Sequence, residues 1–80
     1  MTTDIEIKKM RWHSRRGMLE LDLLLVPFAN NKLQHLEDRL KNLYRQLLTE
    51  EDQDLFSWLI QKEVAPDPEL NEIIHKILEN

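Results

Sequence analysis

Residues 33–47 read LQHLEDRLKNLYRQL, and leucine recurs in this stretch at intervals of three and four positions. The repeating residues are Leu33, Leu36, Leu40, Leu43 and Leu47. Residues three and four apart lie on one face of an α-helix, so this spacing predicts one helix with a buried face. It is the clearest periodic signal in the chain, and it indicates a fold built from helices.

The flanking segments show the same spacing between recognisable breaks. Before the leucine repeat, residues 18–28 place apolar side chains on one helix face, and Pro27 is expected to kink or end that helix. After it, Thr49 is a candidate N-cap before an acidic first turn, and Ala65-Pro66 is expected to close the helix that follows. Within that helix, Phe56 and Trp58 cannot both face the core, so one of them should be partly exposed.

Two further helices complete the prediction. Asp67 followed by Pro68 is the pattern of a cap and a first helical residue, and apolar residues at helical spacing follow it. The segment from Asp4 to Ser14, which holds Ile5 and Trp12, gives a weaker helical signal. We therefore expect an all-α fold, a compact five-helix antiparallel bundle that forms a single helical domain over residues 1–80.

Size and composition restrict the classes of function. A chain of 80 residues removes only about 60% of its unfolded surface from water, which leaves little room for an enclosed active site. The sequence has no cysteine, so thiolate metal ligands and cysteine nucleophiles are excluded. The apolar run from Leu23 to Val26 is far shorter than the ~20 residues that cross a bilayer. The beginning of the sequence resembles neither a secretory nor a transit segment, and we expect a cytoplasmic monomer without membrane insertion.

The charge is unevenly distributed. The whole chain carries −4, but residues 1–16 hold five basic and two acidic side chains, a local charge of +3, which leaves −7 on residues 17–80. An anionic partner would therefore dock at the basic end.

Arg16 and Glu20 lie on either side of Gly17, the single glycine of the chain. If one helix carries both charges, their spacing of four places them on one face, where an exposed ion pair would contribute only about 0.3–0.5 kcal/mol. Glycine inside a helix costs about 1 kcal/mol relative to alanine, so Gly17 should serve a local need. That need is either a positive φ at the end of the first helix or the absence of a side chain where a partner's backbone comes close.

The sequence shows no catalytic or metal-binding constellation. The three histidines have no spacing typical of metal ligands, and we expect His13, His35 and His75 at the surface or its boundary. His13 and Ser14 are adjacent, and neighbouring helical residues do not face each other, so they do not form a nucleophile and base.

Trp12 lies among basic residues, and this pattern has two interpretations. It could stack on a nucleic-acid base while Lys8, Arg11 and Arg15 meet phosphates. Alternatively Trp12 belongs to the core and the cations form a solvated face, which suits an acidic protein better. We therefore expect no nucleic-acid partner.

Several of these residues together resemble a known family. Arg15-Arg16-Gly17-Met18-Leu19-Glu20-Leu21-Asp22, then Pro27-Phe28, then Asp54-Leu55-Phe56-Ser57-Trp58-Leu59 are similar to the SdhE family, the small FAD assembly factors of succinate dehydrogenase. The family signature Arg-Gly-x-x-Glu, the RGxxE motif, falls here on Arg16, Gly17 and Glu20. The preceding Trp12 and Arg15 and the helical frame make the match more specific than the pentapeptide alone.

The resemblance implies a chaperone rather than an enzyme. Such a factor binds the flavoprotein subunit of succinate dehydrogenase, and of fumarate reductase, and promotes covalent attachment of FAD to a client histidine. FAD would be held within the client, with no cofactor held tightly by this chain, because one glycine is too few for a phosphate-binding loop. The resemblance gives a partner-binding set: Trp12, Arg15, Arg16, Gly17, Glu20 and Asp22.

Within this set, Arg16 is expected to donate bidentate hydrogen bonds to the client, and Glu20 is expected to accept hydrogen bonds from the client. Gly17→Arg, Arg16→Ala and Glu20→Ala should each impair flavinylation of the client while the melting temperature stays nearly unchanged. Two other classes remain open: a small nucleic-acid-binding regulator that uses residues 8–16, and an antitoxin-like interaction module that uses exposed apolar residues.

Overall fold

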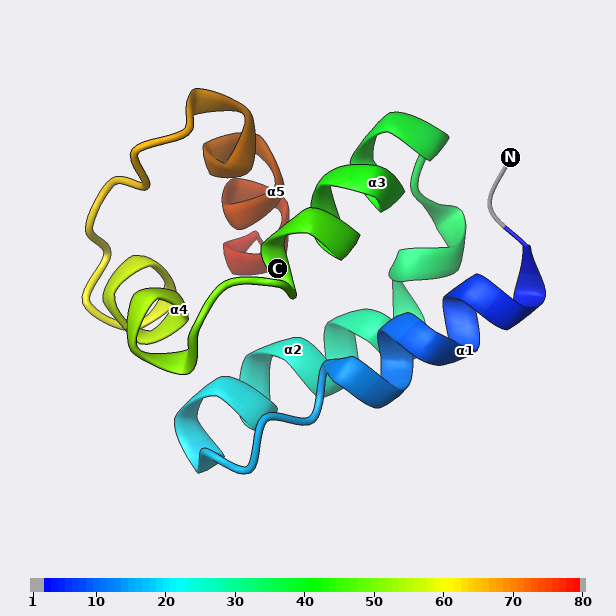
Figure 1. Ribbon diagram of the computed structural model, residues 1–80, viewed down its shortest axis with the longest axis horizontal. Helices are drawn as coiled ribbons and strands as arrows, with labels where there is room; N and C mark the ends of the chain where they lie inside the picture. Colours follow the sequence, from blue (N-terminus) through cyan, green and yellow to red (C-terminus); the bar gives the residue numbers. More distant parts are fainter. Residues whose placement is uncertain (1–2, 80) are drawn as a thin grey trace.

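Helical segments with one apolar face must bury that face against each other, and the chain does so around one core. The computed structural model describes residues 3–79, and in this range it contains five α-helices, one 3₁₀ turn and no strand (Figure 1). The elements are α1 (Asp4–His13), α2 (Leu19–Asn31), η1 (Leu33–His35), α3 (Asp38–Leu47), α4 (Asp52–Leu59) and α5 (Pro68–Leu78). The all-α prediction is confirmed. The outermost ends of the predicted domain, Met1, Thr2 and Asn80, lie outside the described residues.

The core lies between α2 and the other helices. Figure 1 shows α1 beside α2 along the lower edge of the molecule, with α3, α4 and α5 above them. Fully buried residues come from every element except α1: Leu21 and Leu25 of α2, Leu33 of η1, Tyr44 and Leu47 of α3, Leu55 of α4, and Ile73 of α5. Phe28 and Tyr44 stack obliquely at the centre, with ring centroids 5.3 Å apart.

Local start signals position the first and last helices, although only the one at Asp67 was predicted from the sequence. The Thr3 hydroxyl caps α1 by accepting the amide hydrogen of Glu6 at 3.2 Å. Asp67 caps α5 by accepting the amide hydrogen of Glu69 at 2.9 Å, and Pro68 is the first helical residue. The prediction for Asp67 and Pro68 is confirmed.

The leucine repeat is not one helix. Leu33 lies in the 3₁₀ turn, and Leu36 is extended with φ −76° and ψ 151°, so α3 begins only at Asp38. Leu33 is nevertheless fully buried and Leu36 packs against the core. The regular spacing therefore reflects burial on both sides of a tight reversal between α2 and α3.

Two predicted boundaries are wrong. Thr49 does not cap α4, because its hydroxyl donates to the carbonyl oxygen of Gln46 at 2.6 Å and the helix begins three residues later. The same helix ends at Leu59 rather than at Ala65-Pro66. Lys62 then adopts a positive φ of 61°, which α-helical backbone does not allow.

Two other predictions concern residues inside helices, Pro27 in α2 and the pair Phe56 and Trp58 in α4. Pro27 does not end α2, which continues to Asn31. Leu23 and Pro27 both lie on the exposed side, so water can bond the Leu23 carbonyl that proline leaves without a donor. Trp58 is buried and Phe56 is half-buried, as predicted for this pair.

Among residues 3–79, no helix is both long and apolar enough to cross a membrane.

Candidate functional site

The segment between α1 and α2 forms the candidate site. Helix α1 ends at His13 and α2 begins at Leu19, so Arg16 and Gly17 lie in the connection and Glu20 lies in the first turn of α2. The expectation that Arg16 and Glu20 share one helix face is therefore wrong. The break follows from Gly17, whose φ of +82° takes the backbone out of the helical region.

Gly17 meets a conformational need of the chain itself. A φ of +82° favours glycine, because a side chain at this φ is strained. A Cβ atom built on Gly17 would have no neighbour within 4 Å, so no contact inside the chain excludes a side chain here. Of the two needs open from the sequence, the structure shows the positive φ. Clearance for a partner remains a prediction.

Arg16 turns inward and ties the connection to two other helices. Its Nε donates to Oδ1 of Asp52 at 2.7 Å, and Nη2 donates to the carbonyl oxygen of Glu50 at 3.0 Å. Nη1 donates to two carbonyl oxygens, of Leu48 at 2.9 Å and of His13 at 3.1 Å. We call this arrangement the Arg16 clamp.

The electrostatics of the Arg16 clamp are favourable. The carbonyl groups of Leu48 and His13 lie at the C-terminal ends of α3 and α1, where helix dipoles attract a cation. Asp52 is the first residue of α4, a position that favours an acid. Only 16% of the Arg16 side chain is exposed, so these contacts are less screened by water than a surface ion pair would be.

The clamp changes the role expected for Arg16. Four of the five guanidinium N–H donors are engaged inside the chain. The outward bidentate contact expected from the sequence is therefore not available in this conformation. Arg16 acts instead as a positioning residue for the connection that carries Arg15 and Gly17.

Two aspartates bind Arg16, in the middle of the same connection. Asp22 of α2, which the resemblance assigns to the partner-binding set, accepts the backbone N–H of Arg16 inside the chain at 2.7 Å. Asp52, the ion-pair partner of the Arg16 guanidinium, was not predicted. It lies 36 positions from Arg16, and the acidic residues around it are typical of the start of a helix, so no spacing in the sequence connects Asp52 with Arg16.

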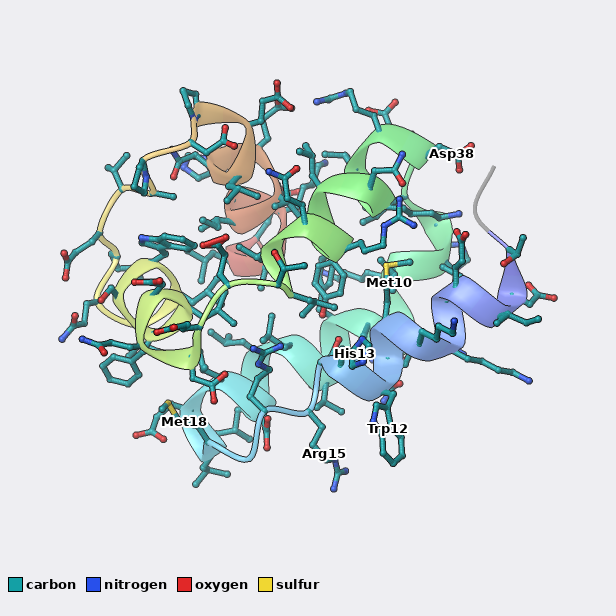
Figure 2. All side chains as sticks on the ribbon, in the orientation of Figure 1. Met10, Trp12, His13, Arg15, Met18 and Asp38 are labelled. Carbon is teal, nitrogen blue, oxygen red and sulfur yellow. The ribbon has the colours of Figure 1, made fainter. Side chains whose placement is uncertain are left out.

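The remaining candidates lie on the outside. Trp12, Arg15 and Glu20 are exposed, and Figure 2 shows Trp12 and Arg15 pointing away from the ribbon at the lower edge. The alternative that places Trp12 in the core is wrong, because 80% of its surface is exposed. Ile7 and Met10 form the buried face of α1 instead.

The candidate residues open onto different hollows of the surface. Trp12 and Arg15 line a groove between α1 and α2, whereas Arg16 lines a second hollow with Lys9, His13 and Arg45. Glu20 lines a third, together with Met18, Gln53, Phe56, Ser57 and Gln61. The structure brings Arg16 and Asp22 together, places Trp12 and Arg15 in one groove, and places Glu20 in a separate hollow.

The nucleophilic and imidazole side chains show no catalytic arrangement in the described part of the chain. Ser14 is fully buried and shares a 2.5 Å hydrogen bond with the Tyr44 hydroxyl. His13, His35 and His75 are exposed, as predicted, and no group of three or more histidine or acidic side chains in residues 3–79 could hold a metal ion.

Comparison with known proteins gives one consistent answer. A family model described as "Flavinator of succinate dehydrogenase" matches residues 8–80, which include the whole connection between α1 and α2. The chain belongs to this family. That assignment confirms the resemblance inferred from the residues around Arg16 and Gly17.

Curated relatives in the family are similar over most of their length. The FAD assembly factor SdhE of Pseudomonas savastanoi pv. phaseolicola is 51% identical over 79 residues, which cover 99% of this chain and 94% of the relative. The protein of the same name from Shewanella oneidensis is 47% identical over 73 residues, 91% of this chain and 89% of the relative. That from Idiomarina loihiensis is 41% identical over 71 residues, 89% and 79% of the two chains.

Proposed function

We propose that this chain binds the flavoprotein subunit of succinate dehydrogenase, and of fumarate reductase, and promotes covalent attachment of FAD to a histidine of that client. FAD is then a substrate of the client's modification and not a resident cofactor of this chain. We further propose that the chain acts as a chaperone and leaves the bond-forming chemistry to the client. It would work in the cytoplasm as a monomer, without a nucleic-acid partner.

The observation that carries the proposal is the Arg16 clamp within a member of this family. The clamp holds a short, glycine-containing connection in a fixed shape on the surface, with Arg15 and Glu20 exposed beside it. A fixed surface loses little conformational entropy when a partner binds, which suits a protein that must orient another chain.

The chemical contribution of such a factor is orientation. Holding a nucleophilic histidine against the 8α-methyl carbon of the flavin converts an improbable encounter into a reaction between positioned groups. In this proposal Glu20 is the contact residue for the client, because its side chain is exposed and makes no hydrogen bond or ion pair among residues 3–79. Arg16 supports the client-binding surface from inside.

The proposal is tested by expressing a succinate dehydrogenase flavoprotein subunit with and without this chain. Covalently bound flavin is then measured by its fluorescence in a denaturing gel. We expect a strong increase with the chain present, and equal fluorescence in both samples would overturn the assembly role.

Glu20→Ala separates contact from folding in the same assay. We expect this variant to lose most of the flavin fluorescence while its melting temperature changes little, because Glu20 has no partner in the described range. Glu63→Ala is the matched control, an exposed acid in the loop before α5. Normal flavinylation with Glu20→Ala would remove Glu20 from the client-binding surface.

A further inference from the structure

A groove between α1 and α2 combines an exposed aromatic ring with basic side chains. Its lining residues are Lys8, Arg11, Trp12 and Arg15 on one side, and Val26 and Asn30 of α2 on the other. The first four follow the helical spacing of one face, and no acidic residue lines the groove. In a chain with a net charge of −4, this concentration of positive charge is local.

The aromatic part of the groove is unusually open to water. Trp12 exposes 80% of its surface, the second-highest value among the exposed large apolar residues, after Val64. Val26, half-buried on α2, extends the apolar surface across the groove. Tryptophan with a polar surround is typical of protein contact sites, where the ring supplies large contact area at low entropic cost.

The charges of the groove are not neutralised inside the chain. Arg11 is fixed across the groove by hydrogen bonds to the carbonyl oxygen of Ala29 at 3.3 Å and to Oε1 of Gln34 at 3.2 Å. In the described part of the chain, neither Lys8 nor Arg15 nor Arg11 has a carboxylate within the 4.0 Å of an ion pair. The complementary occupant therefore carries negative charge.

We infer that this groove binds an acidic segment of the flavoprotein client, with carboxylates at Lys8 and Arg15 and an apolar side chain on Trp12. The inference rests on the proposed function and adds a second contact to it, separate from the hollow lined by Glu20. The Arg16 clamp fixes the backbone immediately after Arg15, so both contacts keep a constant relative position.

The observations favour a protein segment over a nucleic acid. Proteins that bind single strands stack successive bases on several aromatic rings, whereas Trp12 is the one aromatic residue lining this groove. The charge of −7 on residues 17–80 also repels a long polyanion. A short acidic segment avoids that repulsion because it ends within the groove.

The test uses the full chain labelled with 5-fluorotryptophan and the unlabelled apo-flavoprotein subunit. The two tryptophans give two ¹⁹F signals, which a Trp12→Phe variant assigns. We expect the Trp12 signal to shift and to lose its sensitivity to exchange of H₂O for D₂O on binding, whereas the signal of buried Trp58 stays in place. If the client binds and becomes flavinylated without any change in the Trp12 signal, the inference that the groove binds the client is overturned and the proposed function stays intact.

Charge reversal tests the acidic partner. We expect Lys8→Glu combined with Arg15→Glu to weaken client binding by about tenfold or more at low salt. The control combines Lys76→Glu and Lys32→Glu, which change the net charge equally on exposed positions outside the groove, and we expect it to bind within about twofold of the unmodified chain. Equal weakening by both double variants would show a general charge effect and contradict the groove.

Zero-length carbodiimide coupling then identifies the segment. An amide between the Lys8 amine and a client aspartate or glutamate, located by mass spectrometry, is the expected product. Coupling through Lys76 alone would overturn the inference. A Trp12 shift with single-stranded oligothymidylate but not with client would replace it with the nucleic-acid alternative, and absence of client binding altogether would overturn both this inference and the proposed function.

Discussion

Two substitutions at Gly17 distinguish its two possible roles, which are a positive φ in the backbone and clearance for a partner. Its φ of +82° strains any residue with a Cβ, and Asn tolerates such a φ better than Ala. We expect Gly17→Ala to lower the free energy of unfolding by about 1–2 kcal/mol and Gly17→Asn by clearly less. Thermal or urea unfolding measures both values.

Flavinylation of the client, measured in the presence of each of these two variants, completes the test. If the client approaches the bare backbone of Gly17, then Gly17→Asn folds well and still fails to support flavinylation. If positive φ is the whole requirement, Gly17→Asn is active. Gly17→Arg combines both effects, so its melting temperature is now expected to fall, contrary to the expectation from the sequence.

Arg16 should be sensitive even to the replacement that keeps its charge. Lysine cannot reproduce the planar set of donors that reaches Asp52, Leu48 and Glu50 together. We expect Arg16→Lys to lower the free energy of unfolding by about 2 kcal/mol and the melting temperature by about 10 °C. Arg16→Ala should lose at least as much.

The control for Arg16 is its exposed neighbour. Arg15→Lys changes the same residue type one position earlier, where no side-chain bond is made in residues 3–79, and its stability should change by less than about 0.5 kcal/mol. Equal melting temperatures for Arg15→Lys and Arg16→Lys would contradict the clamp. The clamp could not be predicted from the sequence, because three of its four acceptors lie 32 to 36 positions away and two of those three are backbone carbonyls.

At the scale of the element, α5 depends on its first residues. Asp67 accepts the amide hydrogen of Glu69, a group that otherwise has no partner within the helix. Asp67→Ala should lower the free energy of unfolding by about 1 kcal/mol, whereas Asp67→Asn keeps the acceptor and should cost much less. Urea unfolding followed by circular dichroism measures the difference, and equal losses would show that the cap itself contributes nothing.

The sequence predicts a helix whose start is marked by residues within one turn, but it does not predict where the chain turns between helices. The cap at Asp67 with Pro68 located the start of α5, because both residues act within one turn. The leucines from 33 to 47 wrongly predicted one helix. Leu33 and Leu36 are buried by the turn before α3, and their positions continue the leucine spacing of that helix. The end of α4 was also missed, since Lys62 reaches its positive φ without glycine or asparagine.

For the candidate site, too, the sequence indicated neighbouring residues but not their contacts with distant segments. Arg15, Arg16, Gly17, Glu20 and Asp22 were located by a resemblance of contiguous residues. The sequence could not show that Arg16 turns inward, since that depends on where the ends of α3 and α4 lie. Nor could it place Trp12, because the apolar residues of the first helix fall on two opposite faces, Ile5 with Trp12 and Ile7 with Met10, and the spacing does not show which face is buried.

At the scale of the molecule, one buried polar contact joins α1, α2 and α3. The Ser14 hydroxyl donates to the Met10 carbonyl oxygen at 2.7 Å and shares a 2.5 Å hydrogen bond with the Tyr44 hydroxyl. Because the Ser14 hydrogen goes to Met10, the single hydrogen of the Tyr44 hydroxyl is shared between Ser14 Oγ and the Leu25 carbonyl oxygen, which lies 3.4 Å away. Because Ser14 ends α1 just before Arg15, this contact fixes the direction in which the chain enters the candidate site.

Tyr44 makes the stability of the whole molecule dependent on alkaline pH. Burial raises the pKa of Tyr44 from its ordinary value of 10.0 to about 12, although the Ser14 hydrogen bond and the charge of Arg16 both act to lower it. Because the folded pKa lies above the unfolded one, the neutral phenol stabilises the fold fully below pH 10, and this contribution is lost as the pH rises towards 12. The shift corresponds to about 2–3 kcal/mol.

The measurement is urea unfolding at several pH values between 9 and 12, compared with Tyr44→Phe. The prediction concerns the difference in stability between the two proteins at each pH. Tyr44→Phe should be less stable at pH 9, because Ser14 and Leu25 lose a hydrogen-bond partner, and the gap should narrow as the pH rises. A constant gap would show that Tyr44 ionises equally in the folded and unfolded chains, and the entry of α1 into the site would then not depend on a buried neutral phenol.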